Sequence, residues 1–397
     1  MWKQAGEAMR ILHLTPYYAP AYAFGGVVRA VEGMAAALVK RGHEVTVLTT
    51  DALDQRRRYD GPPDDMIDGV RVLRRPNAWP WLRGRLNLST PRNMKRTAEA
   101  ILPAVDVLHV HEFRTLENLL AAPVAQKLGK PIVLSPHGTL NLETGRGRLK
   151  TVWDRLLSPG LALRLDHVAA LTEAERAEAE NLWRNFGKRQ RPTRFSVIPN
   201  GVDRPEIDQR RMAADFRARY ALGDSPVVLF MGRLQARKGV DVLIQAFIAA
   251  GVEDARLLIV GPDEGMLPRL RALAAGDPRI VFTGYLDGDA RLGALAAGDI
   301  FALPATGEGQ PIAALEALAA GLPAVLSPGC NLDEVAETGA GFVVEATAAA
   351  FANQLGLLLI DVELRAAMGQ RARRLAEARY EWDQVAMQLE EVYAGLL

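Results

Sequence analysis

The sequence predicts two Rossmann-like α/β domains, each built on a parallel β-sheet. Short apolar runs alternate with longer helical patterns along the whole chain, which is typical of βαβ units. The alternation restarts near residue 200, and 397 residues exceed the size of one typical core. We therefore expect an N-terminal domain over 1–200, a C-terminal domain over 201–381, and a last helix over about 382–397.

The apolar runs predict the strands of both domains. Helical patterns between them, such as 118–129 and 240–251, end at glycine, as helices commonly do. The pair Asp64–Asp65 is expected in a loop. The expected strands are 10–16, 43–50, 70–75, 105–111, 131–138, 167–172 and 195–203, and then 227–234, 255–262, 279–286, 300–305 and 323–328.

Composition excludes several classes of protein. The net charge of +1 gives no nucleic-acid signature, although residues 1–200 hold 30 basic against 20 acidic residues and the remainder 18 against 27. The single cysteine, Cys330, excludes an intrachain disulfide and is expected to be inert in a loop. No apolar run reaches the ~18 residues of a membrane span, and the start lacks a signal-peptide core. We expect a cytoplasmic protein, with contact at the inner face of the cell membrane left open.

Two cations lie at the carboxyl end of the strand expected at 227–234 and just beyond it. Ligands of open α/β sheets bind beyond the carboxyl ends of the strands. Arg233 and Lys238 lie there in a turn bounded by Gly232 and Gly239, directly before a helix. A helix N-terminus with two cations suits a diphosphate, and a solvated basic turn is an equal alternative.

Two carboxylates occupy the stretch GEGQPIAALEALAAGLP at 307–323. Pro311 is expected to be the first residue of a helix that ends at Gly321, with Glu308 in the turn before it and Glu316 in its second turn. One carboxylate could accept hydrogen bonds from sugar hydroxyls, and the other from both hydroxyls of a ribose. Alternatively, Glu308 complements the helix dipole and Glu316 faces water, although its apolar neighbours argue against the latter.

Three histidines fall near the ends of strands in the first half. His109 and His111 share one face of their strand, but without a third ligand in view a metal site is disfavoured. His111, nearer the end of the strand, is expected on the acceptor side of a site. His137 by itself could be an ordinary buried histidine.

Five stretches together resemble one known family. SPHGTL (135–140), PNGVD (199–203), GRLQARKG (232–239), FTGYLDGD (282–289) and the Glu-x7-Glu stretch are similar to motifs of the retaining, nucleotide-sugar-dependent glycosyltransferases of family 4. The resemblance runs nearly end to end. It implies the GT-B architecture, in which two Rossmann-like domains face each other across a cleft and the terminal helix returns to the first domain.

The resemblance also implies the roles of individual residues. Arg233 and Lys238 would bind the donor diphosphate and stabilise the leaving nucleotide. Glu308 and His137 would contact the transferred sugar, so these four form the expected catalytic set. Glu316 would hold the ribose. The rest of the implied donor site consists of Gly25, Gly26, Gly232, Tyr285, Leu286, Gly309, Gln310, Pro311 and Ile312.

One departure from the family pattern lies at the first glutamate. The usual turn is Glu-Gly-Phe-Gly, whereas this chain has Glu308, Gly309, Gln310 and Pro311. Proline removes one backbone donor, so the hydrogen bonds to the sugar differ from the commonest set. The cations would neutralise the leaving phosphate without a metal or other cofactor, and attack on the face it leaves would retain configuration.

We therefore expect a retaining hexosyltransferase that uses a UDP- or GDP-linked sugar and a saccharide or lipid-linked acceptor, in cell-envelope polysaccharide or glycolipid synthesis. A nucleotide-sugar epimerase of the same fold and an inactive nucleotide-sugar-binding partner are the alternatives. A dehydrogenase is disfavoured because no G-x-G-x-x-G follows the first strand. The stretch 74–87, with Trp79, Trp81 and several arginines, suits a membrane interface or a phosphorylated acceptor, or is a surface loop packed on itself.

Overall fold

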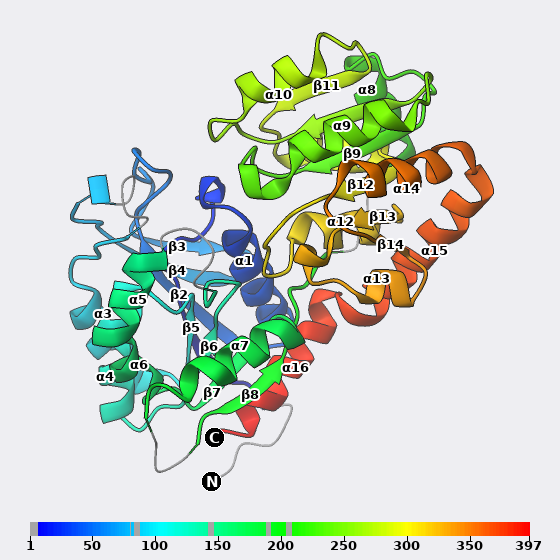
Figure 1. Ribbon diagram of the computed structural model, residues 1–397. Coiled ribbons are helices and arrows are strands. Elements are labelled where there is room, and N and C mark those ends of the chain that lie inside the picture. The colour runs from blue at the N-terminus through cyan, green and yellow to red at the C-terminus, as the bar shows by residue number, and fades with distance from the viewer. Residues whose placement is uncertain (1–6, 80, 83–87, 142–146, 188–191, 204–208) are drawn as a thin grey trace. The chain divides into compact units, whose positions relative to one another are not determined.

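The computed structural model describes residues 7–79, 81–82, 88–141, 147–187, 192–203 and 209–397. It divides into two compact units, each an α/β sheet with helices on its faces (Figure 1). Unit 1 comprises Met1–Gly201 and Trp382–Leu397, and unit 2 comprises Val202–Glu381. The chain thus passes from unit 1 to unit 2 after residue 201, one residue beyond the expected boundary at 200. No helix among the described residues has the length and apolar character needed to cross a bilayer.

Unit 1 contains a sheet with the strand order β3-β4-β2-β1-β5-β6-β7-β8 among the described residues. All neighbouring strands are parallel except β3, which pairs antiparallel with β4. The expectation of a loop at Asp64–Asp65 was therefore wrong: four residues without a long apolar run form an edge strand because β4 offers a free edge. The strands are β1 (Arg10–Leu14), β2 (Glu44–Thr50), β3 (Asp64–Ile67), β4 (Val70–Arg75), β5 (Val107–His111), β6 (Ile132–Ser135), β7 (His167–Ala170) and β8 (Arg194–Val197).

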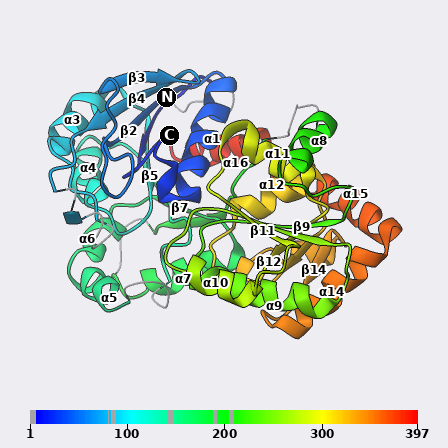
Figure 2. The same cartoon turned by 90° about the horizontal axis from the view of Figure 1, so that it is seen from above.

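Helices cover both faces of this sheet, with α3, α4 and α6 on one side and α1 and α16 on the other (Figures 1 and 2). Two of them begin at threonine N-caps, Thr115 for α4 and Thr172 for α7, whose hydroxyls accept the third backbone N–H of the helix. The helical segments are η1 (Tyr22–Phe24), α1 (Gly26–Lys40), α3 (Met94–Ile101), η2 (Leu102–Ala104), α4 (Leu116–Lys127), α5 (Gly147–Leu156), α6 (Ser158–Ala162), α7 (Glu173–Trp183) and α16 (Trp382–Ala394).

Unit 2 contains a fully parallel sheet with the order β11-β10-β9-β12-β13-β14. The five expected strands are confirmed, and β14 is an addition of only three residues at the edge. The strands are β9 (Val227–Met231), β10 (Arg256–Val260), β11 (Ile280–Gly284), β12 (Ile300–Leu303), β13 (Ala324–Leu326) and β14 (Gly341–Val343).

Two helix layers enclose the sheet of unit 2, with α9, α10 and α14 on one side and α8, α11 and α12 on the other (Figure 2). Helix α9 ends at Gly251 and α12 at Gly321, both in the left-handed conformation that glycine adopts readily. The helical segments are α8 (Gln209–Arg219), η3 (Ala236–Lys238), α9 (Val240–Ala250), α10 (Leu267–Ala274), α11 (Gly288–Ala297), α12 (Ile312–Ala320), η4 (Pro328–Cys330), α13 (Glu334–Glu337), α14 (Ala348–Ile360) and α15 (Val362–Arg379).

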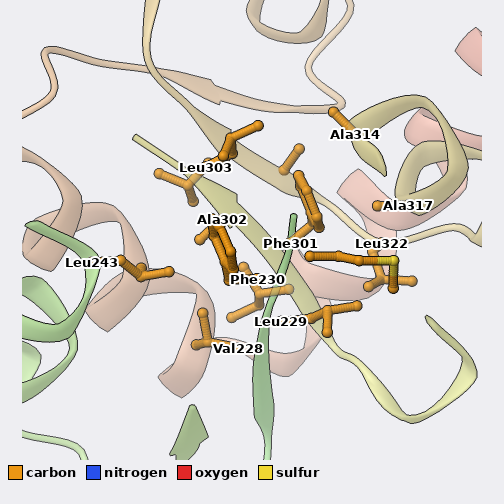
Figure 3. Close-up of a cluster of buried hydrophobic side chains, with 14 of the residues drawn as sticks. Val228, Leu229, Phe230, Leu243, Phe301, Ala302, Leu303, Ala314, Ala317 and Leu322 are labelled. Carbon is orange, nitrogen blue, oxygen red and sulfur yellow. The ribbon is translucent and has the colours of Figure 1, made fainter. Parts of the chain in front are cut away.

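The core of unit 2 lies against both faces of its central strands, so β9 and β12 are buried along their whole length. This is why they read as continuous apolar runs rather than alternating ones. Figure 3 shows side chains of these strands packed with those of α9 and α12. The labelled members are Val228, Leu229, Phe230, Leu243, Phe301, Ala302, Leu303, Ala314, Ala317 and Leu322.

Strand order reverses at one point in each sheet, between β1 and β5 in unit 1 and between β9 and β12 in unit 2. At such a switch point the loops after the two strands diverge to opposite faces and leave a crevice at the carboxyl ends. The residues that follow β9, β12, β5 and the neighbouring β6 are those that the sequence singled out.

Candidate functional site

Two loops of unit 2 meet at the switch point, one after β9 and the other after β12. Gly239, at the end of the first loop, has a φ of 65°, and a Cβ there would lie 2.2 Å from the carbonyl oxygen of Pro304. The backbone N–H of Thr306 donates to the carbonyl oxygen of Arg237 at 2.9 Å. The absence of a side chain at Gly239 thus permits the close approach that brings the side chains of the two loops together.

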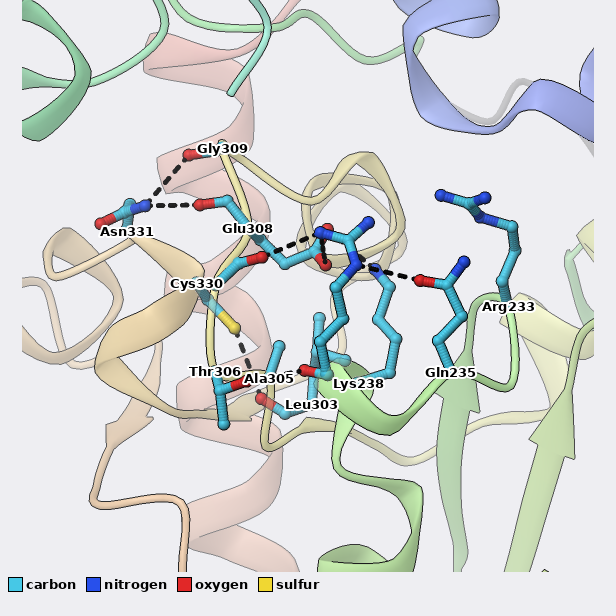
Figure 4. A network of polar contacts seen from close by, with 12 residues as sticks. Arg233, Gln235, Lys238, Leu303, Ala305, Thr306, Glu308, Gly309, Cys330 and Asn331 are labelled. Carbon is cyan, nitrogen blue, oxygen red and sulfur yellow. Dashed lines mark hydrogen bonds and ion pairs between the residues drawn. The ribbon is translucent and has the colours of Figure 1, made fainter. Parts of the chain in front are cut away.

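Glu308 lies between two cations of the first loop (Figure 4). Its Oε2 is 2.9 Å from Nζ of Lys238, and its Oε1 is 3.2 Å from Nη1 of Arg237. Arg237 also donates to the carbonyl oxygen of Gly307 at 2.9 Å. The structure therefore brings the predicted Lys238 and Glu308 into direct contact. Arg237 was missed by the sequence analysis, although it precedes Lys238 in the same glycine-bounded turn.

Arg233 stands apart from Glu308 in the same loop (Figure 4). Its Nη1 donates to Oε1 of Glu264 at 2.9 Å. The side chain of Gln235 donates to the same carboxylate and accepts from Nε of Arg237 at 3.0 Å. A continuous row of polar groups thus joins Arg233 to Glu308, with three cations and two carboxylates in it.

The backbone around Glu308 is held from the loop after β13. The N–H of Glu308 donates to the carbonyl oxygen of Gly329 at 2.8 Å. Nδ2 of Asn331 donates to the carbonyl oxygens of Glu308 and Gly309 at 2.6 and 3.3 Å (Figure 4). The sequence carried no signal for Asn331. Beside it, Cys330 ends the short helix η4 rather than lying in the expected loop, and burial raises the pKa of its thiol to about 11, so the thiol is protonated.

Helix α12 begins directly after this turn. Pro311 is its N-cap, with φ −74° and ψ 112°, so the helix starts at Ile312, one residue later than expected. The reason is that ψ of Pro311 is extended rather than helical. Of the first-turn N–H groups of α12, that of Ala314 donates to the carbonyl oxygen of Pro311 at 3.0 Å. Those of Ile312 and Ala313 precede the first helical acceptor and point toward the N-terminal end, where Gly309 lies. This end suits an anion.

Glu316 lies in the second turn of α12, as expected, and forms an ion pair with Arg291 of α11. The two side chains are only 15% and 13% exposed, so Glu316 is not a solvated helix residue. Burial acts to lower the pKa of Arg291, but the neighbouring Glu316 carboxylate outweighs it and the pKa is raised. Tyr285, 48% exposed, and the half-buried Leu286 lie between β11 and α11. Arg291 belongs to no motif, so the sequence did not reveal it.

In unit 1, Gly25 and Gly26 form the junction of η1 with α1. Gly25 has φ 100° and ψ −156°, and its N–H donates to the carbonyl oxygen of Tyr22 at 3.0 Å. A residue with a side chain rarely adopts this conformation. The first turn of α1 carries no acidic residue, so this second predicted phosphate-binding segment also presents a helix N-terminus.

The predicted His137 and His111 are joined in a hydrogen-bonded row with a third histidine, His13 of β1. Nε2 of His137 lies 2.9 Å from Nδ1 of His111, and Nε2 of His111 lies 2.8 Å from Nδ1 of His13. His111 is fully buried with both ring nitrogens bonded, so its side chain contacts other histidines rather than the surface. Burial lowers the pKa of His13 to about 3 and of His137 to about 4, and that of His111 well below its usual value.

His109 completes the cluster. It lies opposite His13 in the pairing of β1 with β5, and ligand atoms of His13, His109 and His111 lie within 4.8 Å of one another. The third potential metal ligand is thus His13, which the sequence analysis missed. Its signal was a histidine inside an apolar strand. The nitrogens of His109 already have partners, Nδ1 with Tyr393 of α16 at 2.6 Å and Nε2 with Ser135 at 2.8 Å.

A buried carboxylate anchors the loop that carries His137. Glu175 of α7 accepts from the N–H of Gly138 at 2.5 Å and from the N–H of Leu171 at 2.7 Å. Burial raises the pKa of Glu175 to about 7 against the effect of these two donors. His137 itself has a φ of 56°, which is unusual for a residue with a side chain. Glu175 therefore holds a strained turn in place, and it too was missed.

The stretch 74–87 is only partly a surface feature. Arg74 is buried, with its guanidinium 4.0 Å from the centroid of a tyrosine ring, and so is not a cation of the surface. Trp79 and Trp81 are 59% and 60% exposed. Arg83 and Arg85 lie outside the described residues.

The chain is similar to known glycosyltransferases along its length. Residues 225–361 match the family "Glycosyl transferases group 1", and residues 24–205 match "Glycosyltransferase Family 4". The GDP-mannose-dependent alpha-(1-6)-phosphatidylinositol monomannoside mannosyltransferase of Mycolicibacterium smegmatis is 30% identical over 391 residues, which cover 94% of this chain and 95% of that protein. The D-inositol 3-phosphate glycosyltransferase of Xylanimonas cellulosilytica is 29% identical over 413 residues, covering 98% and 96%.

Among solved structures, Anabaena HepE in complex with UDP and glucose superposes with a TM-score of 0.75 at 20% identity, covering 97% of this chain and 99% of that one. This likeness establishes the fold.

Proposed function

The chain belongs to the group 1, family 4 glycosyltransferases, and on that premise we propose that it transfers mannose from GDP-mannose, with retention and without a metal, to an inositol-phosphate or lipid-linked acceptor. The family, the GT-B fold and the glycosyltransferase activity expected from the sequence are confirmed. The choice of GDP-mannose rests on the activities of relatives such as the Mycolicibacterium enzyme.

The contact between Lys238 and Glu308 at the switch point is the observation that carries the proposal. A diphosphate bound beside Lys238 and Arg237 neutralises part of the positive charge that Glu308 now neutralises. This frees the Glu308 carboxylate to accept a hydrogen bond from a sugar hydroxyl. The N-terminus of α12 adds backbone donors on the same side. These groups supply the electrostatic stabilisation that a leaving diphosphate needs.

The chemical step follows from this charge distribution. The acceptor hydroxyl oxygen attacks the anomeric carbon on the face that the phosphate leaves, the carbon–oxygen bond to the phosphate breaks, and the hydroxyl proton passes to the departing phosphate oxygen. Glu316 accepts from the ribose while Arg291 fixes its carboxylate. Configuration at the anomeric carbon is retained.

A lipid-linked acceptor fits the surface of α5. Its apolar side chains Leu149, Val152 and Leu156 are all more than half exposed, and Arg148 and Arg155 lie exposed on the same helix. Positions 149, 152 and 156 fall on one face of a helix. An apolar stripe with cations beside it is typical of helices that lie on an anionic membrane, and we propose peripheral membrane contact through it.

The test begins with thermal stabilisation of the protein by GDP, UDP, ADP and dTDP and by their sugar conjugates. Ligand at ~100 times its dissociation constant adds about 2.7 kcal/mol to stability. We expect GDP and GDP-mannose to stabilise the wild type and Glu363→Ala, an exposed carboxylate on α15, but not Glu316→Ala. Absence of any nucleotide effect at millimolar concentration would refute the donor site.

Turnover is then measured with GDP-mannose and an inositol-phosphate acceptor. We expect Lys238→Ala to lower the rate about 10²-fold, as loss of one transition-state donor does. Proton NMR of the product gives the anomeric configuration, and excess EDTA tests metal independence. An inverted product or complete inhibition by EDTA would refute the mechanism, and conversion of the donor into an epimer without acceptor would favour the epimerase.

A further inference from the structure

The row His137–His111–His13 has a chemical property beyond its packing. Both of its contacts join ring nitrogens, at 2.9 and 2.8 Å, and all three side chains are buried, with His137 8% exposed. Their lowered pKa values keep them neutral at pH 7. A neutral imidazole has one N–H and one bare nitrogen. The protons of the three rings must therefore all point in the same direction along the row.

The two ends of the row differ. Nε2 of His13 is buried and has no hydrogen-bond partner among the described residues. Nδ1 of His137, at the other end, has no bond to a described residue and is accessible to solvent, so this edge of the ring reaches the surface after the carboxyl end of β6. The row thus connects a surface nitrogen to a deeply buried one.

The buried end favours one direction. If the protons point toward His13, its Nε2–H is a buried donor without an acceptor. If they point toward His137, Nε2 of His13 is a bare nitrogen and Nδ1 of His137 carries the proton. Buried N–H groups without acceptors are rarer than under-satisfied acceptors. The second direction is therefore the more stable one.

We propose that His13 and His111 are positioning residues that hold His137 as its Nδ1–H tautomer, so that it donates a hydrogen bond to an oxygen of the sugar in the bound sugar nucleotide. The ligand in this statement rests on the proposed function, whereas the tautomer does not. His13 is separated from His137 by the ring of His111, so it acts on His137 only through His111 and does not contact the ligand.

A metal site at His13, His109 and His111 is the competing interpretation. Coordination through Nε2 of His13 would still need one nitrogen of His109 and one nitrogen of His111 to release their present partners, because both nitrogens of each of these rings are bonded. Among the described residues, Nε2 of His13 is the one ring nitrogen of these three histidines without a partner, as the hydrogen-bonded row predicts for its end.

The test is the tautomer of His137 in full-length protein labelled with [15N]histidine, which has only six histidines. The wild type is compared with His13→Asn, whose amide nitrogen replaces ring Nδ1, and with His13→Gln, whose amide lies nearer the place of Nε2. His167→Gln is the control, because His167 is a buried histidine bonded to Ser196 outside the row.

We expect Nδ1–H at His137 in the wild type, His13→Asn and His167→Gln, and a mixture of both tautomers in His13→Gln. The dissociation constant of GDP-mannose should rise roughly three- to tenfold in His13→Gln, the loss of one hydrogen bond, while that of GDP stays unchanged.

An Nε2–H tautomer in the wild type, or an unchanged His137 in a folded His13→Gln, would overturn the proposal. So would joint shifts of His13, His109 and His111 on addition of one equivalent of Zn2+, which would identify a metal site. If the wild type binds neither GDP-mannose nor GDP, the proposed donor fails, and the tautomers still decide the role of His13.

Discussion

Substituting Gly33 by alanine places helix propensity against tertiary packing. Gly33 lies inside α1, where alanine normally stabilises a helix by roughly 0.5–1 kcal/mol. A Cβ at this position, however, would lie 2.2 Å from Cε2 of Trp382, the first residue of α16. A Cβ at Gly201 would lie equally close to the same indole ring, 2.2 Å from Cδ2. The ring fills the space that two missing side chains leave.

The packing cost should exceed the gain in propensity. Real Cβ contacts do not approach 2.2 Å, so the indole would have to shift, and its close packing against Gly201 hinders that shift. Overpacking of this kind costs about 1–3 kcal/mol. Subtracting the gain in propensity leaves a net loss of about 0–2.5 kcal/mol for Gly33→Ala, with a central value of about 1 kcal/mol. Sequence considerations alone would predict the opposite sign.

Urea unfolding followed by tryptophan fluorescence measures the effect in unit 1, because all six tryptophans of the chain lie in that unit. The matched control is Gly160→Ala. Gly160 is exposed on α6, and its Cβ would meet only the end of the Arg164 side chain, at 3.5 Å. We expect the control to unfold at the same or a slightly higher urea concentration than the wild type.

A double-mutant cycle identifies the cause. In a Trp382→Phe background the smaller ring leaves room for the methyl group, so Gly33→Ala should be neutral or stabilising there. If Gly33→Ala stabilises the wild type, or costs the same in both backgrounds, the close packing of α16 on α1 does not determine stability and the reasoning fails.

Two further predictions concern charge in unit 1. Glu390→Gln should lower the free energy of unfolding by about 1 kcal/mol, because Glu390 accepts from Arg41 at 2.5 Å and contacts His43 at 2.8 Å at a partly exposed site. Burial acts to raise the pKa of Glu390, but these two contacts outweigh burial and the pKa is lowered. The stabilisation from Glu390 is therefore present above pH ~4.5 and is lost as the pH falls through the pKa of the folded state. An equal urea midpoint for variant and wild type would contradict this. In the folded state the pKa is about 3 for His13 and about 4 for His137, against the ordinary histidine value of 6.5. Unfolding therefore takes up protons below pH 6.5. Stability should fall as the pH drops from about 6.5 toward 4, by about 1.4 kcal/mol per pH unit for each histidine. His13→Gln should fall less steeply over this range, and parallel curves for variant and wild type would refute the assignment.

The sequence by itself determined the repeated strand–helix order and the positions of the residues at the strand ends. Apolar runs such as 227–231 are readable because a strand covered on both faces must be apolar throughout. Gly239, Lys238, Glu308 and Glu316 were likewise readable, since they stand at fixed places after strands and in one helix. Expectations failed where pairing rather than pattern makes the element, as at β3.

The tertiary structure decided which of these residues meet. Lys238 contacts Glu308 because Gly239 lets two loops touch, and Glu316 has Arg291 as its partner because α11 packs beside α12. His13 joins the histidines of β5 because β1 and β5, 96 residues apart at His13 and His109, are neighbours in the sheet. Periodicity reports what one segment buries, whereas contacts between segments depend on sheet order and on the spaces that missing side chains leave. The ion pairs and the histidine row therefore became visible only in three dimensions.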